Sequence, residues 1–340
     1  MKDQIMLDGF DEVLKSLMAA DRIVITAHEL PDGDAVGSCL ALKSFLTDKG
    51  KDAEVVLPTD DIGAASILDD IGSVKDVGKF DFSVLPDLLV CLDCADPSRL
   101  CDRRFRDWIG RVPTVNIDHH GKELFGDSNY VVVDASSTGE LVFNLFETAG
   151  WTPTRSAAEA IWCALVTDTR RFSLPSTTAS TLRCAAVLLE CGARSARIND
   201  AIFSQESPAV FELRTRAMSS LERWCCGRVA AISLQPEDFA ATGCRKKDAD
   251  EFPEIPRGVK GASIALYFYP YPETKPEITK VSIRSREGAP LSARDIAVHF
   301  GGAGHADSAG VKFNGTVAEA VGAVRAYLET QIEVKEQGKE

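Results

Sequence analysis

The chain has 340 residues, a formal net charge of −13 at pH 7 and a hydrophobic content of 45%. Its length exceeds the usual size of one hydrophobic core, so we expect two domains. The negative charge argues against a sequence-independent clamp on long nucleic acid, because such binding comes from neutralising many phosphates. Short oligonucleotides and small anionic substrates stay open, since bound metal ions can attract them locally.

The composition is typical of a soluble cytoplasmic protein. No stretch approaches about 18 uncharged apolar residues, so we expect no membrane span. The first residues lack the profile of a signal peptide, and in the cytoplasm the ten cysteines should be reduced. Cys91 and Cys94 have the spacing of a zinc pair, but no second pair completes a zinc site, so we expect structural thiols.

Strand and helix patterns alternate through the first half of the chain. The candidate strands cover residues 22–27, 53–57, 88–92, 112–117 and 130–133, and the candidate helices cover 10–20, 35–49, 137–149, 156–166 and 177–191. Such alternation is typical of a parallel sheet with flanking helices. We therefore predict an α/β catalytic domain over residues 1–192.

The pattern changes after this domain. Residues 193–222 are charged and compatible with helix, with Pro208 as a helix start, and are expected to form a helical linker. Strands at 228–234, 262–269 and 278–285 and helices at 292–299 and 316–334 then predict a smaller α+β domain over residues 223–335. We expect the active site in the cleft between the two domains.

Six potential metal ligands lie at the ends of the predicted elements of the first domain. Three come from one tight loop after the first strand, and three follow later strands or end a helix; they are His28, Asp32, Asp34, Asp93, His119 and Asp168. The carboxyl ends of parallel strands form the ligand crevice of open α/β sheets. Converging carboxylates and imidazoles are the ligands that a hydrolytic two-metal centre requires.

The charge of this set favours two metal ions over one. Its four aspartates carry about −4, which matches two divalent cations. Histidine favours a transition metal over calcium or magnesium, and the distal Glu of an EF-hand loop is missing. Structural explanations stay open for single residues, because Asp32 and Asp34 are compatible with a turn and an Asp after a strand is compatible with a helix cap.

Three other segments have structural explanations beside functional ones. Residues 137–140 form a capping-box pattern before an apolar helix, which explains their polar side chains without a catalytic role. The aromatic residues of 267–271 are expected to pack within a strand, although an aromatic face can also stack bases. The glycines of 301–305 are typical of a flexible turn and can also form an anion-binding nest.

Several segments together resemble the motifs of the DHH phosphoesterases. HELPDGDAVGS at 28–38, CLDCAD at 91–96, IDHH at 117–120 and LVTDTRRF at 165–172 occur in that family's order. VSIRS at 281–285 and FGGAGHADSAG at 300–310 resemble the phosphate- and nucleotide-recognising motifs of the DHH-associated C-terminal domain. Length and domain pairing most closely resemble the nanoRNases, which degrade short oligoribonucleotides and remove the 3′-phosphate of 3′-phosphoadenosine 5′-phosphate.

The resemblance implies two divalent metal ions, for which members of the family commonly use Mn²⁺. One ion would be held by His28, Asp32 and Asp93. The other would be held by a set that shares the bridging Asp93, namely Asp34, Asp93, His119 and Asp168.

The resemblance also implies roles around the metal ions. Asp118 would orient His119, and His120 would face the substrate phosphate. Asp93, Asp118 and His120 would then form the catalytic set. In the second domain, the substrate-binding residues besides His120 would be Arg284, Ser285, Gly302, Gly304 and His305.

Two positions depart from the family's pattern. Ala303 stands where glycine is usual, which adds a methyl group near the expected phosphate. Arg170 and Arg171 follow Asp168 where many nanoRNases have glycine first, and a basic residue there is similar to the cyclic-di-AMP phosphodiesterases.

We therefore predict a hydrolase acting on short RNA oligonucleotides and small nucleotides. A linear or cyclic dinucleotide phosphodiesterase is the alternative within the family. A nucleotide sensor without turnover is the alternative from another class of protein. The oligomeric state is not fixed by the sequence, and a homodimer is compatible with it.

Overall fold

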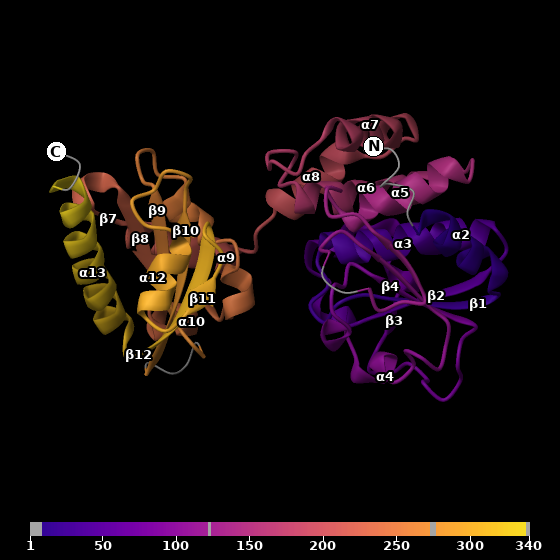
Figure 1. Cartoon of the computed structure of the whole chain (residues 1–340), viewed down its shortest axis with the longest axis horizontal. Helices are drawn as coiled ribbons and strands as arrows, with labels where there is room; N and C mark the ends of the chain where they lie inside the picture. The colour runs from indigo at the N-terminus through magenta and orange to yellow at the C-terminus, as the bar shows by residue number, and fades with distance from the viewer. Residues whose placement is uncertain (1–8, 122–123, 273–276, 338–340) are drawn as a thin grey trace. The chain divides into compact units, whose positions relative to one another are not determined.

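A computed structural model describes residues 9–121, 124–272 and 277–337 of the chain. The chain forms two compact units, Met1–Gln205 and Glu206–Glu340. Each unit has its own sheet of six strands and its own hydrophobic core (Figure 1). Within the described residues, no helix combines the length and the apolar character that crossing a bilayer requires.

The first unit contains a parallel sheet in the order β3-β2-β1-β4-β5-β6. Its strands are β1 (Arg22–Thr26), β2 (Asp52–Leu57), β3 (Lys75–Asp76), β4 (Leu88–Leu92), β5 (Thr114–Asp118) and β6 (Ser128–Val131). The chain moves outward from β1 to β3, returns to the other side of β1 with β4, and continues outward to β6. This reversal creates a topological switch point between the carboxyl ends of β1 and β4, where open α/β sheets bind ligands.

Helices cover both faces of this sheet (Figure 1). One face is covered by α2 (Phe10–Ala19), α3 (Gly33–Asp48) and α5 (Thr138–Thr148), on which α6 (Arg155–Asp168), α7 (Ala179–Glu190) and α8 (Ser195–Phe203) are layered. The other face packs against α4 (Arg103–Arg106) and the loops around it. Ile23 and Ile25 of β1 pack into the core between the sheet and α3. Val24 packs into a smaller core between the sheet and α4, so both faces of the strand are buried. Such burial is typical of parallel sheets.

The second unit contains a mixed sheet in the order β11-β12-β10-β9-β8-β7. Its strands are β7 (Glu222–Trp224), β8 (Val229–Ser233), β9 (Ile264–Pro270), β10 (Ile278–Ser285), β11 (Ala303–Gly304) and β12 (Ser308–Asn314). Among the described strand pairs of this second sheet, only β8–β9 is parallel. The predicted smaller α+β architecture is therefore confirmed.

The helices of the second unit lie on both faces of its sheet. One face packs against α12 (Ala293–His299) and α13 (Val317–Gln337). The other face packs, over β8 and β9, against α9 (Pro208–Ser219), α10 (Pro236–Thr242) and α11 (Glu254–Arg257). The expected linker at 193–222 thus contains α8 in the first unit and α9 in the second, and α9 begins at the predicted Pro208.

The cysteines have the predicted structural character. All ten are free thiols, and Cys91 and Cys94 are buried. Burial raises the pKa of Cys94 to about 12, and its Sγ donates a hydrogen bond to the carbonyl of Asp96. Cys91 and Cys94 are therefore held protonated inside the fold, whereas Cys226 is exposed.

Candidate metal centre

Three neighbouring parallel strands bring polar residues to the switch point of the first sheet. His28 follows β1, Asp93 follows β4, and His119 follows β5. All three side chains are buried or nearly so. The strand order therefore brings residues that are far apart in the sequence into one cluster.

The loop after β1 ends in the N-terminus of α3 and supplies two carboxylates. Asp32 caps the helix, because its Oδ1 accepts hydrogen bonds from the backbone N–H groups of Asp34 and Ala35 at 3.0 and 3.1 Å. Asp32 also lies beside His28 and Asp93, with one ligand atom of each residue within 4.8 Å of the others. The helix cap and the candidate ligand are thus the same residue, so the structural explanation does not compete with the functional one.

Asp34 is fully buried and is held by the N-terminus of α5. Its two carboxylate oxygens accept hydrogen bonds from the backbone N–H groups of Thr138 and Gly139 at 2.7 and 2.9 Å. The hydroxyl of Ser38 donates a third hydrogen bond at 3.0 Å. Burial, together with the charges of Asp93 and Asp168, still raises the pKa of Asp34 well above its ordinary value. A cation beside Asp34 would remove this cost of burying its charge.

Residues 137–140 therefore have a role that local sequence reasoning missed. Ser137 does cap α5, accepting a hydrogen bond from the N–H of Glu140 at 3.1 Å. The next two residues, however, hold Asp34 as described above. A Cβ on Gly139 would lie 2.4 Å from the Cβ of Ala164, so only glycine lets α5 approach α6 this closely. The one sequence signal was a glycine inside the first turn of a predicted helix.

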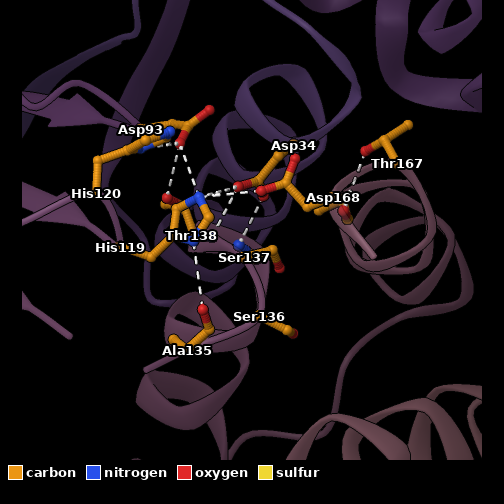
Figure 2. A network of polar contacts seen from close by, with 12 residues as sticks. Asp34, Asp93, His119, His120, Ala135, Ser136, Ser137, Thr138, Thr167 and Asp168 are labelled. Atoms are coloured by element: carbon orange, nitrogen blue, oxygen red, sulfur yellow. Dashed lines mark hydrogen bonds and ion pairs between the residues drawn. The ribbon is translucent and has the colours of Figure 1, made fainter. Parts of the chain in front are cut away.

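Asp93 lies between the histidines of the cluster. Its Oδ2 is 3.4 Å from Nε2 of His28. Its Oδ1 is 3.6 Å from Nε2 of His119 (Figure 2). Burial alone would raise the pKa of Asp93, but its contacts with His120 and His28 hold the pKa below its ordinary value. The backbone φ of Asp93 is 53°, a left-handed conformation that is uncommon outside glycine and clusters at functional sites. Its two oxygens are thus directed toward two different parts of the cluster.

His119 presents a nitrogen to three carboxylates. Its Nδ1 lies 3.3 Å from the carbonyl oxygen of Ala135, where an N–H can donate. Its Nε2 lies 3.0 Å from Oδ2 of Asp168, 3.7 Å from Oδ2 of Asp34 and 3.6 Å from Asp93 (Figure 2). Although burial lowers the pKa of His119, the nearby Asp168 raises it overall. A backbone carbonyl on Nδ1 fixes the tautomer that leaves Nε2 free for a metal ion.

Asp118 contacts His120 and does not orient His119, so this part of the expectation is wrong. Its Oδ1 lies 2.9 Å from Nδ1 of His120, while a backbone carbonyl holds His119. The reason is the alternation of side chains at the end of β5, which places Asp118 and His120 on the same side. Hydrogen bonds to Asp118 and Asp93 raise the pKa of His120 to about 10. His120 is therefore a half-exposed cation beside the cluster.

The cluster fits two divalent metal ions. One group of potential ligands consists of His28, Asp32 and Asp93, and a second consists of Asp34, His119 and Asp168, each with ligand atoms within 4.8 Å of one another. Nε2 of His119 faces the carboxylates of Asp34, Asp93 and Asp168, and Nε2 of His28 faces Asp93. Imidazole nitrogens that converge with several carboxylates are explained by cations between them. These features define the class of protein, a metal-dependent hydrolase with a doubly wound α/β fold.

The expected substrate-binding residues lie near one another in the second unit. Arg284 on β10 pairs with Ser308 on β12, and β12 pairs with the glycine-rich β11. Close packing explains the glycines at positions 302 and 304. A Cβ on Gly302 would lie 2.3 Å from the carbonyl oxygen of Gly310, and a Cβ on Gly304 would lie 2.4 Å from Cα of Ala309. His305, in the loop that joins the two strands, is exposed.

Ser285 supports the expected substrate-binding loop from inside the fold, and Ala303 lies at its surface. Ser285 is buried, and its hydroxyl donates to the carbonyl of Ala306 at 2.7 Å and accepts from the N–H of Ala293 at 2.9 Å. This side chain therefore holds the loop after His305 in place. Ala303 is exposed in β11, so its methyl group does not disturb the packing of the strand.

The arginines after Asp168 lie in a strained turn. Arg170, Arg171 and Phe172 have consecutive φ values of 46°, 60° and 62°, all in the left-handed region. The guanidinium of Arg171 lies over the ring of Phe203 at 4.7 Å. Such strain persists only where surrounding contacts impose it and is frequent at functional sites.

Comparison with known proteins agrees with this class. Residues 22–165 match the model of the DHH family, N-terminal domain. The chain is 33% identical to the bifunctional oligoribonuclease and PAP phosphatase NrnA of Thermus thermophilus, over 89% of this chain and 87% of that protein. It is 23% identical to the protein of the same name from Bacillus subtilis, over 86% of this chain and 90% of that protein. The chain belongs to the DHH family of phosphoesterases.

A solved structure supports the fold along the whole chain. The crystal structure of an exopolyphosphatase-related protein from Bacteroides fragilis is 24% identical in sequence, with a TM-score of 0.82. The match covers 96% of this chain and 97% of that one. The likeness extends over both units, so the pairing of a parallel-sheet unit with a smaller mixed-sheet unit is a shared architecture.

Proposed function

We propose that the protein hydrolyses short oligoribonucleotides to mononucleotides and 3′-phosphoadenosine 5′-phosphate to AMP. The observation that carries this proposal is the presence of two groups of potential metal ligands, each with a histidine close to Asp93. It is supported by likeness over most of the chain to two proteins named as oligoribonucleases and PAP phosphatases. Both reactions break a bond between phosphorus and an ester oxygen, so one metal centre can serve both.

The metal ions in this proposal are Mn²⁺. His28 and Asp32 would hold one ion, Asp34, His119 and Asp168 the other, and Asp93 both. Mixed imidazole and carboxylate ligands suit manganese. Two bound divalent cations would lower the pKa of water and neutralise charge on the phosphoryl group.

The protein's own groups position the substrate and its protons. His120 is held by Asp118 at 2.9 Å, and its raised pKa favours the charged form. This imidazolium would attract a phosphate oxygen at the edge of the cluster. Thr138, Gly139 and Ser38 hold the buried Asp34, so that it does not reorganise during turnover.

We further propose that the second unit selects the substrate. Arg284 offers a guanidinium that can pair with two phosphate oxygens. The exposed His305, in the loop that follows Gly302 and Gly304, would bind a second part of the same anion. Ser285 would support this loop from beneath through its bond to Ala306.

The proposal is tested by product formation over time in Mn²⁺ with four substrates. These are a 5′-labelled RNA dinucleotide, a 24-nucleotide RNA, cyclic di-AMP and 3′-phosphoadenosine 5′-phosphate. We expect turnover of the dinucleotide and of 3′-phosphoadenosine 5′-phosphate and little of the long RNA. Preference for cyclic di-AMP would assign the protein to the dinucleotide phosphodiesterases, and binding without turnover would make it a sensor.

A further inference from the structure

One face of the second sheet carries a group of cationic side chains that the proposed function does not use. Side chains alternate along β10, so Lys280, Ser282 and Arg284 share a face while the residues between them are buried on the other. On the neighbouring strand β12, Lys312 lies directly opposite Lys280. Lys312 is exposed and Lys280 partly so.

The two lysines repel each other across the strands. Like charges directly opposite in an antiparallel pair are destabilising. A third lysine, Lys246, adds to this repulsion, and the pKa of Lys280 is lowered first by burial and then by Lys246 and Lys312. The ring of Tyr271 partly offsets the repulsion, with the Nζ atoms of Lys280 and Lys312 at 4.7 and 5.4 Å from its centre. We call Lys246, Lys280, Lys312 and Tyr271 the lysine surface.

Among the described residues, two neighbouring carboxylates offset part of the charge of this surface. Asp250 forms an ion pair with Lys246 at 2.5 Å, and Glu254 lies 3.8 Å from Nε of Arg284. Lys280 and Lys312 add their charges to these pairs, so the face stays positive in a chain whose net charge is −13. Sequences that keep a local repulsion usually gain a function from it.

A cavity joins the lysine surface to Arg284. It has a volume of about 310 Å³, and its lining includes Lys246, Lys280 and Arg284. Tyr267 and Tyr269 form an aromatic part of the wall, with ring centres 4.6 Å apart. This volume is at the lower end of the range of small-ligand sites. The cavity is therefore large enough for a phosphate group and part of a nucleotide.

We propose that the lysine surface binds a second phosphodiester of a single-stranded oligoribonucleotide, beyond the phosphate that Arg284 would bind. This inference rests on the proposed function and adds a subsite to it. Lys280 and Arg284 are four residues apart on one strand, which separates their Cα atoms by about 13 Å. A dinucleotide has a single internal phosphodiester, so the subsite should distinguish longer oligonucleotides from dinucleotides.

Binding of RNA without turnover tests this proposal directly. The full chain in EDTA is titrated against a 5′-fluorescein hexaribonucleotide, and the anisotropy is measured over a series of salt concentrations. We expect the Lys280→Ala, Lys312→Ala double variant to bind at least about tenfold more weakly. We also expect the slope of log Kd against log salt to fall by about 0.7 for each lysine removed. Lys260→Ala, an exposed lysine of the same unit, is the matched control and should leave both values unchanged.

Kinetics then separate this subsite from the metal centre. In Mn²⁺, the double variant should lose about tenfold in kcat/KM on the hexanucleotide and change less than about twofold on the dinucleotide. The charge-conserving variant Lys280→Arg should retain hexanucleotide activity. An unchanged salt slope, no measurable binding of the hexanucleotide by the unmodified protein, or equal losses on both substrates would each overturn the proposal. Lysine-dependent binding of a hexaglutamate peptide in place of RNA would assign the surface to an acidic protein segment.

The two proposals fail in distinguishable ways. If the unmodified protein hydrolyses none of the RNA substrates, the proposed function is wrong. The salt-dependent binding measured in EDTA still decides the lysine surface in that case, because it requires no turnover.

Discussion

The hydroxyl of Thr138 donates a hydrogen bond to Oδ1 of Asp93 at 3.2 Å, at the centre of the ligand cluster (Figure 2). The backbone N–H of the same threonine donates to Asp34 at 2.7 Å. One residue at the N-terminus of α5 therefore fixes two carboxylates that approach the cluster from different elements. Outer contacts of this kind orient metal ligands and tune their affinity.

Replacing Thr138 by valine should weaken metal binding while preserving the shape of the side chain. Loss of such an outer contact typically costs about 10- to 100-fold in metal affinity or activity. Thr138→Ser keeps the hydroxyl and is the matched control, with close to normal affinity expected. The measurement is Mn²⁺ binding by calorimetry on the full chain. Equal affinity of the valine and serine variants would show that the hydroxyl contributes nothing.

Asp93→Asn should nearly abolish turnover. Asparagine tolerates the left-handed backbone found at this position, so the fold should persist. A neutral amide cannot hold two cations, and the loss of several kcal/mol of transition-state stabilisation predicts a decrease of at least about a thousandfold in kcat. The dinucleotide assay measures kcat, and circular dichroism verifies folding. Substantial activity of Asp93→Asn, or of Asp93→Ala, would sink the bridging assignment.

Gly139→Ala should destabilise the first unit. The new Cβ would lie 2.4 Å from the Cβ of Ala164, so α5 and α6 must separate. Overpacking of this kind costs about 1–3 kcal/mol. Urea unfolding provides the free energy of unfolding, and Gly72→Ala, where a Cβ meets nothing within 4 Å, is the control. Equal stability of the two variants would mean that the helices have room to move apart.

The metal-free protein should lose stability as the pH rises above neutrality. The folded-state pKa of His120 is raised from 6.5 to about 10, so its stabilising contribution is complete below pH 6.5 and is lost as the pH approaches 10. Asp34 acts in the same direction, because its raised pKa makes the protonated carboxyl the form that the fold favours. Thermal unfolding in EDTA at several pH values measures this slope. His120→Gln should reduce it, and an unchanged slope in that variant would show that His120 does not produce the pH dependence.

Added Mn²⁺ should oppose this pH dependence. Metal ions bind the deprotonated forms of carboxylates and neutral imidazoles, so their stabilising effect increases with pH. The shift in Tm on adding Mn²⁺ should therefore be larger at high pH than at low pH. A shift that is independent of pH would indicate that the cluster does not release protons on binding.

Much of the first unit could be predicted from local patterns. The sequence predicted five helices and five strands of this unit to within a few residues; the strands end at residues 26, 57, 92, 118 and 131. The strands were recognisable because both faces of a parallel strand are apolar. In the second unit, β12 was missed although its side chains alternate, because its first residues were assigned to the glycine-rich segment 300–310. Its place in the sheet comes from pairing with β10, which no local pattern specifies.

The ligand residues could be proposed from the sequence because they lie at the ends of strands and helices that the pattern had located. The contacts around them could not. Whether Asp118 meets His119 or His120 depends on how β5 ends, and whether residues 137–140 only cap a helix depends on how close α5 approaches Asp34. The lysine surface was hidden for the same reason, because Lys280 and Lys312 become neighbours only through strand register.

Activity should return to the metal-stripped protein as metal is added back. The protein is stripped with EDTA, dialysed and titrated with Mn²⁺ while AMP release from a diadenylate RNA is followed. The account predicts no release without metal and full activity once two Mn²⁺ ions are bound per chain. Full activity with a single ion per chain, or hydrolysis in EDTA, would contradict it.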